Sequence, residues 1–195
     1  TFIESFGLRL TGDGKRIAVL AVDPSSARTG GSILGDKTRM ELLSRDPNAF
    51  IRPSPSRSEL GGVARRTREA VMLCEAAGFD VVLVETVGVG QSETDIAGTA
   101  DTIVFCVQPG SGDSLQFMKA GIVEIPDIVV VTKSDLGSAA QRARADVKGA
   151  LSLAEAARGD WTIPVLGLSV QQRQGVADLI AAAEEAISLA PGGHR

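Results

Sequence analysis

A single acidic residue, Glu85, closes an otherwise apolar segment, and a glycine, Gly88, follows three residues later. The segment before it, Val81–Val84, contains only valine and leucine, which predicts a fully buried β-strand. A carboxylate at the end of such a strand is costly unless a partner compensates its charge. A Mg²⁺ ion is a suitable partner, and a glycine N–H can face a phosphate oxygen beside it. The spacing therefore predicts magnesium–phosphate chemistry around Glu85 and Gly88.

Two aspartates extend this set of hard oxygen ligands. Asp23 follows the predicted strand Arg16–Val22, and Asp36 ends the polar, glycine-rich stretch that comes next. Each aspartate taken alone is better explained as a turn or helix cap. Taken with Glu85 at the end of a neighbouring strand, the three favour a magnesium site, because parallel strands present their carboxyl ends at one edge.

A second group of polar residues follows the predicted strand Asp127–Thr132. The run Thr132-Lys133-Ser134-Asp135 resembles the NKxD motif with which GTPases recognise guanine, with Thr in place of Asn. A carboxylate such as Asp135 can accept hydrogen bonds from N1–H and the 2-amino group of guanine, and adenine offers neither donor there. The stem of Lys133 can lie over the base. The alternative is a polar turn with an exposed lysine.

Two details bear on that motif. The hydroxyl of Thr132 is shorter than the side chain of Asn and cannot reproduce both of its amide contacts. Ser169-Val170 follows the last predicted strand, at the place where GTPases have a backbone donor to guanine O6. This second match raises the joint probability of a guanine site.

A further glycine-containing loop begins at Pro109-Gly110 and continues to Lys119. One interpretation is a strand-to-helix connection capped by Asp113. The other is a conformational element that senses a nucleotide or a partner. The sequence supports the two equally.

The elements that must position these residues alternate along the chain. Apolar, β-branched runs predict strands, and apolar positions at helical spacing between them predict helices, as at Leu60–Cys74 and Val176–Ile187. This alternation predicts an α/β fold, a three-layer sandwich with a mainly parallel sheet flanked by helices. The predicted strands are Arg16–Val22, Asp80–Glu85, Asp101–Gln108, Asp127–Thr132 and Pro164–Leu168.

Composition narrows the functional classes. The chain has 195 residues, enough for one α/β domain, and a formal net charge of -4 without a basic block, which argues against nucleic acid as a partner. No apolar run reaches membrane-spanning length. One histidine and no tyrosine nearly exclude histidine-based triads and zinc sites. Cys74 and Cys106 lie in apolar runs and are expected to be small core residues.

One expected motif is missing. A phosphate-binding GxxxxGKS/T loop should precede the first helix of such a fold, and no such run occurs. Thr1–Gly7 is instead typical of the helix that follows that loop. We therefore expect the first strand and the phosphate loop to lie immediately before Thr1, so that these 195 residues are a piece of a longer protein.

Four longer runs make the sequence similar to the MeaB/ArgK-type GTPases, which are associated with methylmalonyl-CoA mutase. These runs are Ala21–Ser26, Thr29–Met40, Phe50–Pro55 and Glu85–Glu93. The resemblance implies a P-loop NTPase of the SIMIBI class, with 1–195 as a single G domain that binds GTP or GDP and Mg²⁺. It implies a catalytic set of Glu85, Gly88 and Lys119, magnesium contacts at Asp23, Asp36 and Glu85, and nucleotide contacts at Thr132, Lys133, Asp135, Ser169 and Val170.

The resemblance also implies a biological role. The intact protein is expected to hydrolyse GTP, to gate the delivery of adenosylcobalamin to the mutase and to protect that enzyme. It is expected to be a homodimer through a C-terminal arm absent here, in the bacterial cytoplasm or, in a eukaryote, the mitochondrial matrix. The alternatives are a nickel-insertion GTPase, an ATP-dependent kinase, which Asp135 disfavours, and a partner-binding G-domain fragment without turnover.

Overall fold

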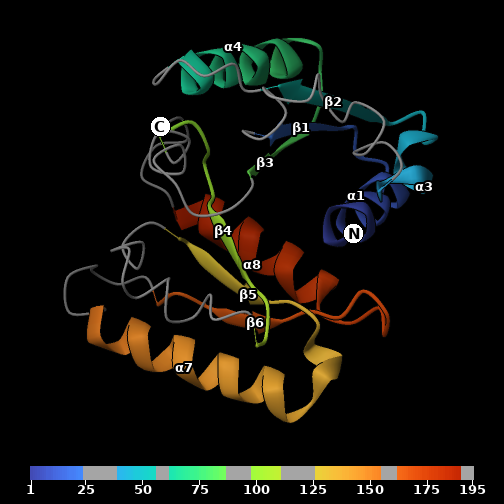
Figure 1. Ribbon diagram of the computed structural model, residues 1–195. Coiled ribbons are helices and arrows are strands. Elements are labelled where there is room, and N and C mark those ends of the chain that lie inside the picture. Colours follow the sequence, from blue (N-terminus) through green and yellow to red (C-terminus); the bar gives the residue numbers. More distant parts are fainter. Residues whose placement is uncertain (24–38, 56–61, 87–97, 111–125, 155–161, 190–195) are drawn as a thin grey trace. The chain divides into compact units, whose positions relative to one another are not determined.

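The computed structural model describes residues 1–23, 39–55, 62–86, 98–110, 126–154 and 162–189 (Figure 1). The chain divides into two compact units, residues 1–100 and 101–195, and each is described here by itself. Each unit contains a three-stranded parallel sheet. That residues 1–195 form a single G domain stays a prediction.

The sheet of the first unit has the strand order β2-β1-β3. Its apolar core lies on both faces of the central strand, because successive side chains of a strand point to opposite sides. Ala18 and Leu20 pack with Cys74 of α4 on one face, and Ile17 lies on the other, near Gly7 of α1. The elements are α1 (Phe2–Gly12), β1 (Ile17–Asp23), α3 (Glu41–Ser44), β2 (Ala49–Pro55), α4 (Gly62–Ala76) and β3 (Val81–Thr86).

Gly7 allows α1 to lie close to the rest of this unit. A Cβ atom at this position would stand 2.7 Å from Leu43 Cδ2 and 2.8 Å from Ile17 Cδ1. Leu43 and Ile17 are both fully buried. A side chain larger than hydrogen would therefore push α1 away from α3 and β1.

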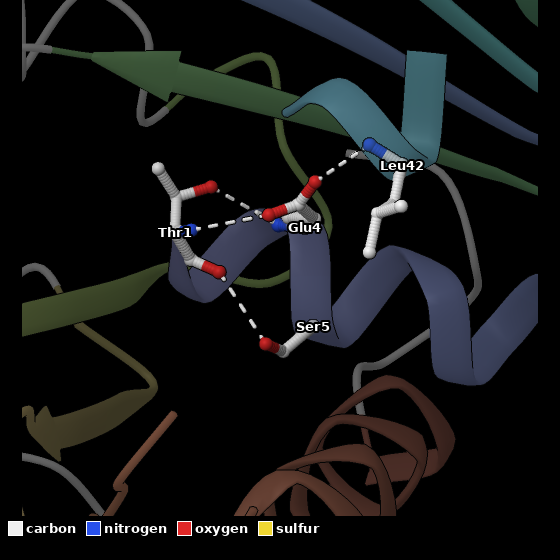
Figure 2. A network of polar contacts seen from close by, with 4 residues as sticks. All are labelled: Thr1, Glu4, Ser5 and Leu42. Atoms are coloured by element: carbon white, nitrogen blue, oxygen red, sulfur yellow. Dashed lines mark hydrogen bonds and ion pairs between the residues drawn. The ribbon is translucent and has the colours of Figure 1, made fainter. Parts of the chain in front are cut away.

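The N-terminus of α1 is joined to the start of α3 by one carboxylate, as Figure 2 shows. Thr1 and Glu4 form a capping box, in which Thr1 Oγ1 accepts from the Glu4 N–H at 3.3 Å. Glu4 Oε1 also accepts from the Leu42 N–H at 2.9 Å. Glu4 thus satisfies a backbone donor at the first turn of α3, which would otherwise have no intrahelical partner.

The sheet of the second unit has the order β4-β5-β6, and α7 and α8 lie on opposite sides of it (Figure 1). The central strand is fully buried, and its alternate residues serve the two faces. Val129 and Val131 pack with Val147 and Leu151 of α7. The elements are β4 (Val104–Val107), β5 (Ile128–Val131), the 3₁₀ turn η3 (Ser134–Leu136), α7 (Ser138–Ala154), β6 (Val165–Gly167) and α8 (Val176–Leu189).

The predicted α/β fold is confirmed, and so are strands near each of the five predicted positions. The strand predicted at Asp101–Gln108 is shorter in the structure, and just before it begins the Ile103 N–H donates to Asp127 Oδ2 at 2.8 Å. The sequence pattern missed β2. This strand carries Pro53 and Pro55, which suit an edge position, and it is an edge of its sheet.

Two predictions about burial were wrong. Val81–Val84 are half-buried rather than fully buried, because β3 is an edge strand in the described sheet. Cys74 is buried as predicted, but Cys106 is exposed on β4, also an edge strand. An apolar run therefore indicated a strand correctly but overstated how completely its residues are covered. In the part of the chain that is described, no helix has the length and apolarity needed to cross a membrane.

Candidate functional site

Two turns of the second unit meet at a hydrogen bond between Ser169 and Asp135. The Ser169 hydroxyl donates to Asp135 Oδ1 at 2.5 Å, although the two residues are 34 positions apart in the sequence. Ser169 is fully buried, and its Oγ also accepts from the Gln172 N–H at 3.1 Å. The contact to Gln172 uses a lone pair of the hydroxyl oxygen, so the hydroxyl proton can still be donated to the carboxylate. One oxygen of Asp135 is therefore held in place.

The first turn, which carries Asp135, follows directly from β5. Its Ser134 N–H donates to the Leu168 carbonyl at 3.0 Å, which ties it to the end of β6. Gly167 lies close to it, since a Cβ there would stand 3.4 Å from Ser134 Cβ. The carboxyl ends of β5 and β6 are thus joined by a backbone hydrogen bond, and the turn that carries Asp135 is anchored to the end of β6.

The second turn, residues 169–175, closes by an antiparallel bridge between Ser169 and Gln174. The Ser169 N–H donates to the Gln174 carbonyl at 3.1 Å, and the Gln174 N–H donates back at 3.0 Å. Gly175 ends the turn with φ +84°, and a Cβ there would stand 2.1 Å from the Gly167 carbonyl oxygen. Only glycine fits this position, so Gly175 sets the path that buries Ser169.

Backbone strain is concentrated in the same two turns. Within the described ranges, the non-glycine residues with positive φ are Lys133 at 52° and Arg173 at 54°. A left-handed conformation is unfavourable for such side chains and persists where the surroundings impose it. One strained residue precedes Asp135 by two positions, and the other follows Ser169 by four. Strain of this kind is typical of ligand-binding turns.

The residues next to Asp135 and Ser169 are open to solvent. Lys133 is exposed, Leu136 is 49% exposed and Val170 is 40% exposed. These groups are suited to binding a flat ring with hydrogen-bond donors on one edge. The Asp135 carboxylate can accept from the donors, and the Lys133 stem and the exposed apolar side chains can contact the ring. The structure therefore brings together Asp135 and Ser169, with Lys133 and Val170 in the same two turns, which are four of the residues that the sequence predicted to contact a base.

The predicted metal ligands belong to the first unit. Glu85 is the penultimate residue of β3 and is in register with Ala21 of β1, two residues before Asp23. Both acids thus lie at the carboxyl ends of neighbouring parallel strands, where ligands of open α/β sheets bind. The Glu85 Oε2 atom is buried. Aspartate and glutamate are residue types that Mg²⁺ prefers as ligands, so these two residue types fit this ion.

Three predicted residues, Asp36, Gly88 and Lys119, lie outside the described residues. Among those that are described, no cluster of three acidic, histidine or cysteine side chains forms a metal site. The magnesium site and the catalytic set therefore stay predictions.

Sequence reasoning missed the residues that hold Asp135 and Ser169 in place. Gln172 contributes only its backbone N–H, and Leu168 contributes only a carbonyl, so neither leaves a signal in residue type. Gly175 could have been found, because a glycine between a polar turn and a helix often marks a positive φ.

Comparisons with solved structures concern the fold. The chain is similar to HypB from Helicobacter pylori in complex with nickel, with a TM-score of 0.67 at 15% identity over 100% of this chain and 84% of that one. It is also similar to FtsY from Mycoplasma mycoides, with a TM-score of 0.56 at 10% identity over 95% of this chain and 64% of that one. Likenesses at such low identity concern the fold alone, which is the SIMIBI-type α/β fold.

The family follows from sequence. The family model described as "Methylmalonyl Co-A mutase-associated GTPase MeaB" matches residues 1–192, so the chain belongs to the MeaB family of GTPases. It is 58% identical over 177 residues to a "Putative GTPase" of Caulobacter vibrioides, covering 90% of this chain and 54% of that protein. It is 51% identical over 181 residues to the mouse "Methylmalonic aciduria type A homolog, mitochondrial", covering 92% of this chain and 44% of that protein. The chain thus spans about half the length of the curated relatives it matches.

Proposed function

We propose that the intact protein binds guanine nucleotides, hydrolyses GTP and serves an adenosylcobalamin-dependent methylmalonyl-CoA mutase as a chaperone. The main support for nucleotide binding is the hydrogen bond from Ser169 to Asp135. It joins two turns that were each predicted to contact the guanine base. Membership of the MeaB family supports the link to the mutase.

Base selection rests on Asp135 in this proposal. Ser169 holds its Oδ1, so the carboxylate presents a fixed edge to the N1–H and 2-amino donors of guanine. Adenine has no donors at these positions, so its binding would give the half-buried Asp135 carboxylate no hydrogen bond from the base. The stem of Lys133 covers one face of the ring, and the Val170 N–H donates to O6.

Phosphate chemistry is assigned to Glu85 and the aspartates. Glu85 and Asp23, with Asp36, would hold Mg²⁺ directly or through its water molecules, and a bound Mg²⁺ ion supplies charge neutralisation of the phosphates. Glu85 orients the attacking water, and the Gly88 N–H donates to the γ-phosphate. Lys119 completes the proposed catalytic set. Transfer of a phosphoryl group to water depends on such positioning and charge more than on covalent chemistry.

The finer biological role is part of the same proposal. The GTPase gates the delivery of adenosylcobalamin to the mutase and protects the enzyme, and the intact protein acts as a homodimer. We assign it to the cytoplasm in a bacterium and to the mitochondrial matrix in a eukaryote.

A nickel-insertion function has one observation in its favour, the fold shared with a protein whose structure contains nickel. That likeness is at 15% identity, whereas the MeaB model matches residues 1–192. Nickel sites use imidazole and thiolate ligands, and the sequence has one histidine and two cysteines. The mutase-associated function is therefore the better supported of the two.

The test of base selection uses Asp135→Asn in the intact protein. An amide in place of the carboxylate can donate to the 2-oxygen of xanthine and no longer accepts from guanine at both donors. We expect GDP to bind about 10- to 100-fold more weakly and xanthosine diphosphate to bind more tightly. The control is Asp146→Asn on the exposed side of α7, which should retain the preference of the parent. Equal affinities for GDP in the Asp135→Asn variant and the parent would contradict the proposal.

The partner is tested with purified mutase. GTP hydrolysis by the intact protein is measured with and without the mutase, and loading of the mutase with adenosylcobalamin is followed in the presence of GTP or GDP. We expect the mutase to stimulate hydrolysis and the nucleotide to change the loading rate. Guanine nucleotide binding without turnover under any of these conditions would favour the partner-binding alternative.

A further inference from the structure

Thr132 occupies the place at which the guanine-reading motif of GTPases has asparagine. Its Oγ1 donates to the Val107 carbonyl at 3.2 Å, and its backbone N–H donates to the same carbonyl oxygen at 2.8 Å. Val107 is fully buried at the end of β4. The Thr132 side chain is therefore directed at the neighbouring strand and helps to join the ends of β4 and β5.

This contact uses the only proton that the hydroxyl has. A threonine hydroxyl can donate one hydrogen bond, whereas the amide group of asparagine can donate two. Because the Thr132 hydroxyl donates its proton in the hydrogen bond to the Val107 carbonyl, it can only accept hydrogen bonds from a ligand. The N7 atom of guanine is itself an acceptor, so it finds no donor in Thr132.

Several backbone donors of the two turns are also engaged. The Ser169 N–H donates to the Gln174 carbonyl, and the Ser134 N–H donates to the Leu168 carbonyl. The Gln172 N–H donates to Ser169 Oγ. These contacts build the turns themselves and leave the corresponding donors unavailable to a base.

We propose that this chain recognises guanine through its N1, 2-amino and O6 groups and leaves N7 unread, with Thr132 as the residue that decides this. The inference rests on the proposed guanine site. It defines the ligand class more narrowly, because a guanine nucleotide altered at N7 retains every group that the site contacts.

The test compares nucleoside diphosphates that differ by one group, using calorimetry on the intact protein. In 7-deaza-GDP a C–H replaces N7, and inosine diphosphate lacks the 2-amino group. We expect 7-deaza-GDP to bind within about twofold of GDP, because no hydrogen bond is lost. We expect inosine diphosphate to bind about tenfold more weakly, because Asp135 loses a donor.

A matched variant, Thr132→Asn, supplies the missing amide donor. It should favour GDP over 7-deaza-GDP by about five- to tenfold, the value of one hydrogen bond. An unchanged ratio in this variant would show that residue 132 does not decide the reading of N7 and would overturn the inference.

The outcomes separate this inference from the proposed function. If the parent protein binds 7-deaza-GDP five times more weakly than GDP or worse, another donor reaches N7 and the inference fails. The guanine site still stands in that case, provided that GDP binds better than inosine diphosphate and ADP. If GDP binds no better than ADP, both the inference and the proposed guanine site are wrong.

Discussion

Ser169 and Asp135 form a hydrogen bond of 2.5 Å from the fully buried serine hydroxyl to the carboxylate on the neighbouring turn. The contact makes one side chain depend on the other for its orientation. It also joins the turn after β5 to the turn after β6. The candidate site therefore depends on β5 and β6 being neighbours in the sheet.

Replacing Ser169 by alanine tests this dependence. The change leaves Asp135 and the Gln172 N–H each without their contact to Oγ. We expect the free energy of unfolding to fall by about 1–3 kcal/mol and GDP to bind about 3- to 10-fold more weakly. Denaturant titration and calorimetry measure the two effects. The exposed Ser188→Ala serves as the control. Loss of stability without loss of affinity would assign Ser169 a purely structural role.

Replacing Glu85 by glutamine tests the proposed magnesium ligand. The amide keeps the size of the side chain but removes its charge, so GTP hydrolysis by the intact protein should fall about 10- to 100-fold at saturating Mg²⁺. Phosphate release measures the rate, and thermal unfolding checks that the variant is folded. Glu75→Gln, at an exposed position of α4, should hydrolyse GTP at the parental rate. Parental hydrolysis by Glu85→Gln would exclude the assigned role.

Replacing Gly175 by alanine tests the turn that buries Ser169. The new Cβ would lie 2.1 Å from the Gly167 carbonyl oxygen, at a backbone φ of +84°. We expect a loss of about 2 kcal/mol or more in the free energy of unfolding. Gly149→Ala is the matched control, because Gly149 lies inside α7 with open space around it and should gain about 0.5–1 kcal/mol. Equal stability of Gly175→Ala and the parent would contradict the observed backbone.

The two cysteines should differ in reactivity. Burial raises the pKa of the Cys74 thiol, and the nearby Arg52 guanidinium opposes this only in part. Because the thiolate is the reactive form, a raised pKa lowers the reactive fraction of Cys74 at any given pH below it. Cys106 is exposed. We expect an alkylating reagent at mildly alkaline pH to label Cys106 first, with Cys74 following only as pH rises or the chain unfolds. Mass spectrometry of digested samples identifies the labelled residue, and equal rates would contradict the burial of Cys74.

Much of the fold could be predicted because its signals are local. Runs of isoleucine and valine such as Ile128–Val131 are typical of strands that are buried on both faces, and this strand is fully buried. The edge strand Ala49–Pro55 was not predicted, because its prolines and Arg52 resemble a loop when its neighbour is unknown. Cys106 was misplaced for a similar reason, since hydropathy does not show which strand lies at an edge.

By itself the sequence determined which chemical groups follow the strands, including the Thr132–Asp135 run, Ser169 and Glu85, and it determined the alternation of strands and helices. Residue type and periodicity are sufficient for this, because both are properties of neighbouring positions. Only the tertiary structure decided that Ser169 donates to Asp135, that Gly175 must be glycine and that the Thr132 hydroxyl is used by Val107. These contacts depend on which strands are adjacent in the sheet, and that order is a long-range property that no local pattern contains.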